Sequence, residues 1–173
     1  KNLLNLKSIL CREHNSKGSF KLVHLNHYKT HQGAGFFASP YEDAAILNMD
    51  FATEGNTQTI AMGRGNTIEH LKGHDWPNAW GAVYLSFTKY LGFKFFDEYK
   101  VMGMAAYGKP TYLDFFEKDL YQFNDETGDF KLNMKYFSFQ HFGLAKPFSE
   151  ELEKALGPTQ QPGTPLTQRE YDL

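Results

Sequence analysis

The spacing of apolar residues along the chain alternates between helical and strand-like periods. Residues 3–10 place leucines and an isoleucine at helical spacing, which predicts an amphipathic helix. The stretches SFKLVHL (19–25) and AAILNMDF (44–51) are apolar over strand length, and the second is typical of a central strand whose tip carries function. Between them, HYKTHQGAGFF (27–37) predicts a helix that Asn26 caps.

The same alternation continues through the rest of the chain. Pro77 marks the start of a helix over residues 77–92, and a second helical segment follows at 97–110. Alternating residues on both sides of NDETGD predict a hairpin within 121–139, and a short helix follows at 149–158. One face of the first of these helices carries large apolar side chains: Trp80, Val83, Tyr84, Phe87 and Leu91. These elements predict a mixed α/β domain, or most of one.

The composition and net charge of the chain exclude some classes of binding partner. The chain has 173 residues, of which 41% are hydrophobic and 16% aromatic, enough for one domain with a core. A net charge of -2 and a pI near 6.4 argue against attraction to nucleic acid or to an anionic membrane. No stretch approaches the roughly 20 apolar residues of a membrane span. The single cysteine, Cys11, fits a reducing compartment, so we expect a cytoplasmic protein.

Three of the seven histidines, His24, His27 and His31, lie within eight positions of one another. Imidazoles at positions i and i+4 of a helix converge on one point, so His27 and His31 are candidate ligands of one divalent cation. Two ligands do not make a site, and a third, usually a carboxylate, must come from elsewhere. The alternative is two partly exposed histidines with no function. His24 is expected to be structural.

A second histidine pair, His70 and His74, repeats this spacing in a segment that looks more like a strand or loop than a helix. On a strand, residues four apart share a face but lie roughly 13 Å apart, which is too far for one metal. We therefore expect both side chains to be exposed to solvent and to bind nothing.

Asp50 is the candidate catalytic residue. It ends the apolar stretch 44–51 and opens a polar loop, DFATEGNTQT. A carboxylate at a strand tip can hold a metal, order a water molecule or act as a base. It can equally be an ordinary turn acid that caps the loop, and the sequence leaves both interpretations open.

The stretch KVMGMAAYGKP (100–110) combines Lys100 with Gly103 and Gly108 among small residues. Glycine and alanine let a backbone or a ligand approach closely, and lysine can meet a phosphate as a point charge. The stretch is neither a Walker loop nor a GxGxxG motif, so close packing between helices is the simpler interpretation.

Taken together and in order, three stretches resemble the N-terminal, actin-like domain of the O-carbamoyltransferases typified by the NodU and CmcH enzymes. They are NHYKTHQGAGFFASPYEDAAILNMD (26–50), PNAWGAVYLSFTKYLGF (77–93) and EYKVMGMAAYGKP (98–110). The closing stretch, 148–173, is similar to the family's lead-in to the helix before its second half. The resemblance covers most of residues 20–173.

The resemblance implies an α/β fold of the actin-like ATPase (ribonuclease H-like) type, with a mixed sheet and helices on both faces. It implies that residues 1–173 are an incomplete fragment of that carbamoyl-transfer domain. The rest of the domain and a C-terminal adenylating domain would then follow in a longer protein. We expect the fragment alone to be inactive and to bind metal weakly.

The resemblance also implies a reaction. In such enzymes the adenylating domain makes a carbamoyl-adenylate from carbamoyl phosphate and ATP, and the actin-like domain transfers the carbamoyl group to a hydroxyl of a sugar or natural product. By position, His27 and His31 would hold a divalent metal, with iron first and manganese or zinc as alternatives. An aspartate beyond Leu173 would complete the ligand set. The residues that would line the nucleotide cleft lie between Lys100 and Gly108, with Gly103 and Tyr107 among them.

The sequence departs from the family pattern at three places. A His-His pair is Asn26-His27 here, the glycines of an Asp-Gly-x-Gly-Glu loop are Phe51 and Thr53, and a serine is Ala79. If those glycines give a phosphate access to the backbone, Phe51 obstructs it.

Two alternatives stay open at this point. One is a threonylcarbamoyl transferase of tRNA modification, against which the lack of a basic patch counts. The other is a catalytically inactive relative that serves as a binding or scaffold domain, which the lost glycines favour.

Overall fold

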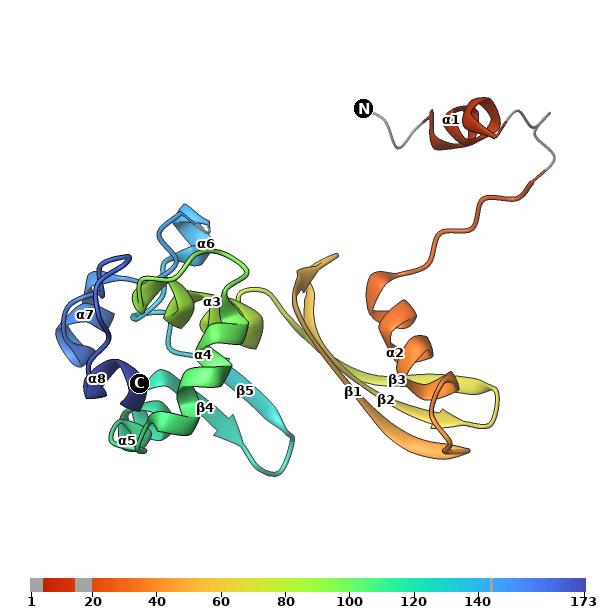
Figure 1. The fold of residues 1–173 in the computed structure, drawn as a ribbon. Helices are drawn as coiled ribbons and strands as arrows, with labels where there is room; N and C mark the ends of the chain where they lie inside the picture. Colours follow the sequence, from red (N-terminus) through yellow and green to blue (C-terminus); the bar gives the residue numbers. More distant parts are fainter. Residues whose placement is uncertain (1–4, 15–19, 144) are drawn as a thin grey trace.

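The computed structural model describes residues 5–14, 20–143 and 145–173, and Figure 1 shows their arrangement. The helices are α1 (Leu6–Glu13), α2 (His27–Phe37), α3 (Trp80–Tyr90), α4 (Glu98–Met104), α5 (Leu113–Phe115), α6 (Phe139–Phe142), α7 (Glu150–Leu156) and α8 (Gln168–Asp172). A 3₁₀ turn, η2 (Ala105–Tyr107), follows α4, and a π-helical turn, η3 (Phe116–Leu120), follows α5. The strands are β1 (Asp43–Thr53), β2 (Asn56–Arg64), β3 (Thr67–Asp75), β4 (Tyr121–Asn124) and β5 (Asp129–Leu132). No helix of these described ranges is long and apolar enough to cross a membrane.

Strands β1, β2 and β3 form an antiparallel sheet in that order, and α2 lies along one of its faces (Figure 1). Burial alternates along β2, as expected for a strand with one covered face. The buried Gln32 of α2 donates a hydrogen bond from Nε2 to Thr59 Oγ1 at 3.0 Å. One turn later, the ring of Phe36 occupies the space that a Cβ at Gly63 would need. The polar contact and the ring together fix α2 on the sheet.

The predicted α/β class is confirmed, but the details of the sheet differ from expectation. The described strands pair only antiparallel, in sheets of three and of two, so they do not form the mixed sheet. β1 lies at the edge of its sheet and not at its centre. Residues 20–26 are neither helix nor strand, which contradicts the part of the expected strand 19–25 that lies within the described residues. Extended backbone becomes a strand only when a neighbour accepts its hydrogen bonds, and no described strand lies beside this segment.

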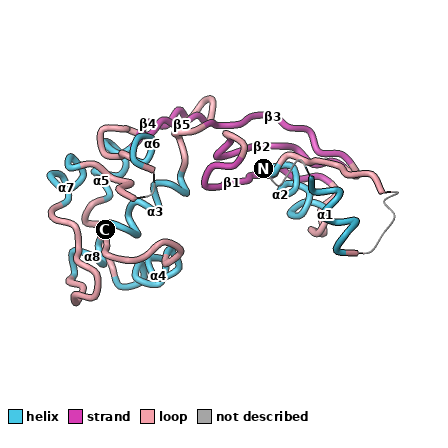
Figure 2. The backbone as a smooth tube through the Cα atoms, turned by 90° about the horizontal axis from the view of Figure 1, so that it is seen from above, coloured by secondary structure: helices cyan, strands magenta, loops and turns pink. Residues whose placement is uncertain are grey.

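The helices after β3 gather at the other end of the molecule around a second core (Figures 1 and 2). The hairpin β4–β5 packs on α3, with the rings of Trp80 and Phe130 stacked at 5.0 Å. The deepest members of this core are fully or almost fully buried: Ala79, Ala82, Tyr90, Leu120, Leu132, Phe137 and Leu152. The expected hairpin and the expected helices near 97–110 and 149–158 are confirmed, although each is shorter than expected.

Helix α3 begins at Trp80, three residues later than Pro77 suggested. The residues in between are held by contacts with other elements. The backbone oxygen of Asn78 accepts a hydrogen bond from Thr57 Oγ1, and its side-chain Oδ1 accepts one from the Leu132 backbone. Tertiary contacts therefore delay the start of the helix beyond the proline.

The second histidine pair is split by the fold. Both residues lie on β3 as expected, and His70 is exposed. His74 is only 8% exposed, so the prediction that it faces solvent is wrong. Its Nε2 lies 3.2 Å from Asp129 Oδ1, and its ring packs at 4.8 Å from Phe130. The hairpin β4–β5, 55 residues further along the chain, covers this end of the sheet.

Asp129 is expected to stabilise the protein near neutral pH through interactions that strong acid removes. Its pKa is lowered from 3.8 to about 2, chiefly by the hydrogen bond from Lys72 and then by that from Thr127. A depressed carboxyl pKa gives stability that is complete above about pH 4 and lost as the pH falls toward about 2. An Asp129→Asn variant should therefore unfold at lower urea concentration than the wild type at pH 6, with the difference shrinking at pH 2. Asp125→Asn, an exposed acid in the same turn, is the control, and an equal shift in both variants would contradict the assignment.

Candidate metal centre

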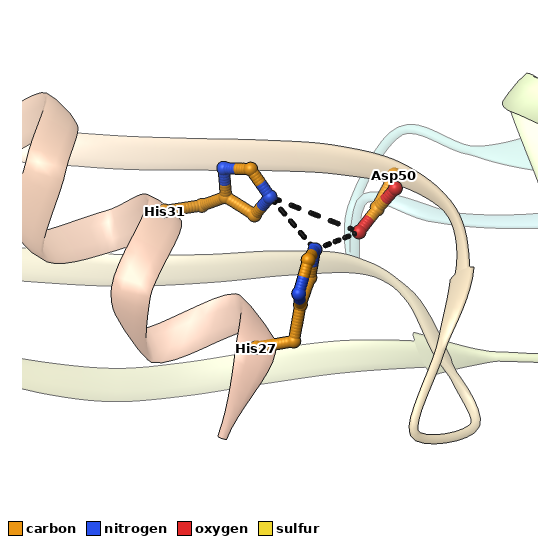
Figure 3. Close-up of side chains that lie close together, drawn as sticks. All are labelled: His27, His31 and Asp50. Carbon is orange, nitrogen blue, oxygen red and sulfur yellow. Dashed lines mark hydrogen bonds and ion pairs between the residues drawn. The ribbon is translucent and has the colours of Figure 1, made fainter. Parts of the chain in front are cut away.

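His27, His31 and Asp50 point toward one another at the junction of α2 and β1 (Figure 3). His27 Nε2 lies 2.8 Å from His31 Nε2 and 2.9 Å from Asp50 Oδ2, and His31 Nε2 lies 4.0 Å from the same carboxylate oxygen. Within the described ranges, this is the one group of three His, Cys, Asp or Glu residues whose ligand atoms all lie within 4.8 Å of one another. The structure thus brings the predicted histidine pair together with the predicted catalytic acid.

The two histidines meet because they lie one turn apart on α2. Asp50 reaches them through an irregularity in β1. Met49 pairs with Gln58 and Thr53 pairs with Asn56, so three residues of β1 lie opposite one residue of β2. A bulge of this kind bends a strand and re-aims its side chains. The backbone N–H of Phe51 also donates to Asp50 Oδ1 at 2.7 Å, which leaves Oδ2 directed at the histidines.

The donor set fits a divalent cation. Ligand atoms about 2.1 Å from a metal are separated by roughly 3.0–3.4 Å, and the three measured separations bracket this range. Two imidazoles and one carboxylate on one side of a metal form the triad found with iron(II), and zinc and manganese accept similar donors. The side chains of His27, His31 and Asp50 are 42%, 51% and 25% exposed, so a cation held there would remain open to solvent on one side.

The structure decides between the two interpretations of Asp50. It lies inside β1 and beside both histidines, and is not a turn acid at a strand tip. The further aspartate ligand implied beyond Leu173 stays a prediction.

Glu54, the glutamate retained at the end of the Asp-Gly-x-Gly-Glu loop, is a functional candidate to which the sequence assigned no role. Asn26 is the residue before α2, as expected, but its side chain makes no capping hydrogen bond. The carboxylate of Glu54, from the turn after β1, takes that role instead. Its Oε2 accepts a hydrogen bond from the His27 backbone N–H at 3.1 Å and one from Asn26 Nδ2 at 3.3 Å. His24, expected as structural support, is exposed and takes no part in the triad.

The four residues predicted for the nucleotide cleft do not line one cavity together. Lys100 Nζ pairs with Asp97 Oδ1 at 2.9 Å, and the hydrogen bond to that carboxylate raises the pKa of Lys100. Tyr107 is 73% exposed, and Gly103 has open space where a Cβ would lie. Gly108 alone among the four lines a cavity of about 400 Å³ between α4 and α8. None of the four belongs to the triad.

Comparison with known proteins identifies the family. Residues 3–146 match the model of the carbamoyltransferase N-terminus. An uncharacterized protein of Synechocystis is 38% identical over 154 residues, 88% of this chain. The nodulation proteins NolNO of Sinorhizobium fredii and NolO of Bradyrhizobium diazoefficiens are 32% and 34% identical over 127 and 105 residues, 72% and 60% of this chain.

The chain spans 25%, 18% and 19% of the lengths of these three relatives. The match to the family model nevertheless extends over most of the chain and includes the histidine pair and Asp50. The resemblance inferred from the sequence is therefore confirmed, and the chain belongs to the carbamoyltransferase family, in which it corresponds to the N-terminal region.

Proposed function

We propose that this chain supplies the metal-binding part of a carbamoyl-transfer site. The carbamoyl group of a carbamoyl-adenylate would pass to a hydroxyl of a sugar or natural product, giving a carbamate ester, AMP and a proton. Family membership supports the reaction class. The convergence of His27, His31 and Asp50 is the observation that carries the proposal.

The roles of the side chains follow from their geometry. His27 and His31 would offer their Nε2 lone pairs from one face of α2, and Asp50 would offer Oδ2 from β1. A divalent cation held by these side chains would supply positive charge to neutralise the phosphate of the carbamoyl-adenylate and so ease the departure of AMP. The hydrogen bond from the Phe51 backbone holds the carboxylate in place, so the site needs little reorganisation when it is filled.

We further propose that the acceptor is a small molecule. The net charge of -2 provides no attraction to the phosphates of a nucleic acid, which dominate the affinity of most proteins for it. In a longer protein, an adenylating domain would make the carbamoyl-adenylate from ATP and carbamoyl phosphate. We expect this chain alone to be inactive. We expect transfer of the labelled carbamoyl group of carbamoyl phosphate to a hydroxyl acceptor once the rest of the transfer domain and an adenylating domain of the family are supplied.

The Asp50→Asn variant tests the triad. Replacing one carboxylate oxygen by an amide removes the anionic ligand, so affinity for Mn²⁺ or Zn²⁺ should fall about 100-fold or more, and any assisted transfer should fall with it. Isothermal titration with each metal measures the change. Asp43→Asn, at the exposed start of the same strand, should bind as the wild type does. Equal metal affinities of the wild type, Asp50→Asn and Asp43→Asn would contradict the proposal.

A further inference from the structure

Glu54 lies where the two metal-bearing elements meet. It occupies the turn between β1 and β2 and has a φ of +56°, a left-handed backbone conformation that is unusual for a residue with a side chain. Such conformations persist where the surrounding contacts hold them. The contacts here are the two hydrogen bonds that Glu54 Oε2 accepts, from the His27 backbone at 3.1 Å and from Asn26 Nδ2 at 3.3 Å.

These hydrogen bonds connect the two elements that carry the candidate metal ligands, β1 with its turn and the start of α2. Glu54 follows Asp50 by four residues in β1 and its turn, and its carboxylate holds the first residue of α2, which is His27 itself. The carboxylate also satisfies a backbone N–H that the first turn of a helix leaves unpaired, and its negative charge suits that end of the helix. Any shift of α2 along the sheet would have to break this link before it separated His27 from Asp50.

We propose that Glu54 is a positioning residue for the metal centre, setting the separation of His27 Nε2 and Asp50 Oδ2, and that Asn26 assists it as a second donor. This inference rests on the proposed metal-binding function. Glu54 is not a fourth ligand in this arrangement, because the triad does not include it and its Oε2 already accepts two hydrogen bonds.

The substitution Glu54→Asp separates a positioning role from a merely structural one. Aspartate tolerates the left-handed conformation better than glutamate does, so the turn should be at least as stable as before. Its carboxylate is one methylene shorter and cannot reach both donors on α2. We therefore expect Glu54→Asp to fold as the wild type does, with at most a small loss of melting temperature from the weakened cap of α2. It should bind Mn²⁺ about 10-fold more weakly, in the range measured for residues that orient metal ligands.

Titration of the 173-residue chain with MnCl₂, followed by the electron paramagnetic resonance signal of free Mn²⁺, measures the affinity. Glu54→Gln keeps an acceptor oxygen at the same reach and should lose less than about 3-fold, whereas Glu54→Ala should lose at least as much as Glu54→Asp. Glu126→Ala, which removes an exposed glutamate from the β4–β5 turn, is the matched control and should leave the affinity unchanged.

Failure of the two proposals would look different. If the wild type bound no Mn²⁺, the proposed metal function would fail and the role of Glu54 with it. If the wild type bound Mn²⁺ and Glu54→Asp bound it equally well, the triad would stand and only the positioning role would be overturned. A Glu54→Asp variant with a lowered melting temperature and an unchanged affinity for Mn²⁺ would likewise show that Glu54 only caps α2.

Discussion

The double variant His27→Ala/His31→Ala is expected to lose measurable binding of divalent cations while keeping its fold. Both imidazoles are about half exposed, so their removal costs little packing, and substitutions of this kind usually change stability by less than about 0.5 kcal/mol. Their loss leaves Asp50 as a single ligand, which cannot hold a metal against water. Metal content after equilibrium dialysis against Mn²⁺ or Zn²⁺, measured by mass spectrometry, should fall from one equivalent per chain to the background level.

The chain provides its own control for this experiment. His70 is exposed and belongs to a pair with the same sequence spacing, but it lies on β3 outside the triad. His70→Ala should retain the full metal equivalent. Retention of one equivalent by the double variant, or equal loss in His70→Ala, would show that the ligands lie elsewhere.

Gly108→Ala is expected to displace α8 and to lower the free energy of unfolding by about 1–3 kcal/mol, the usual cost of overpacking. A Cβ at Gly108 would overlap the backbone oxygen of Tyr171, and a backbone atom cannot rotate away as a side chain can. Asp172, the next residue, accepts hydrogen bonds from the Lys109 backbone and from Thr111, so both would be disturbed. Urea unfolding and faster amide exchange in α8 would report the change.

Gly103→Ala is the matched control from the same segment. The corresponding Cβ would have no atom within 4 Å, and Gly103 lies inside α4. Alanine there should raise the free energy of unfolding by about 0.5–1 kcal/mol, because glycine is the weaker helix former. Should the two alanine variants behave alike, the close approach of α8 to Gly108 would not be the reason for that glycine.

Much of the fold could be predicted because the informative signals are local. The periods of apolar residues located α3 and the β4–β5 hairpin. The candidate cap Asn26 and the i, i+4 spacing of His27 and His31 located α2 and placed both histidines on one side of it. These signals depend only on residues that are close together in the sequence, so they can be interpreted without the tertiary structure. The boundaries were less accurate, as at α3, where contacts from Thr57 and Leu132 hold the residues after Pro77.

The parts that could not be predicted depend on contacts between distant segments. His74 is buried by the β4–β5 hairpin, which no spacing within β3 reveals. Asp50 joins the histidines through a bulge that exists only in the pairing of β1 with β2. The edge position of β1 likewise depends on which strands pair. Glu54 was visible as a retained acid in a loop, but its hydrogen bonds to α2 required the structure.

The short stretch of chain that makes up the metal centre has a consequence for folding. His27 and Glu54 are 27 residues apart, whereas the contacts between β3 and the β4–β5 hairpin connect residues 55 positions apart. Closing the shorter loop costs less chain entropy, and local contacts form sooner during folding. We therefore expect α2, β1 and the turn after β1, the unit that carries the candidate metal centre, to form before the β4–β5 hairpin packs on the sheet. A cation present during synthesis would stabilise that unit in proportion to its affinity, before the rest of the chain has packed.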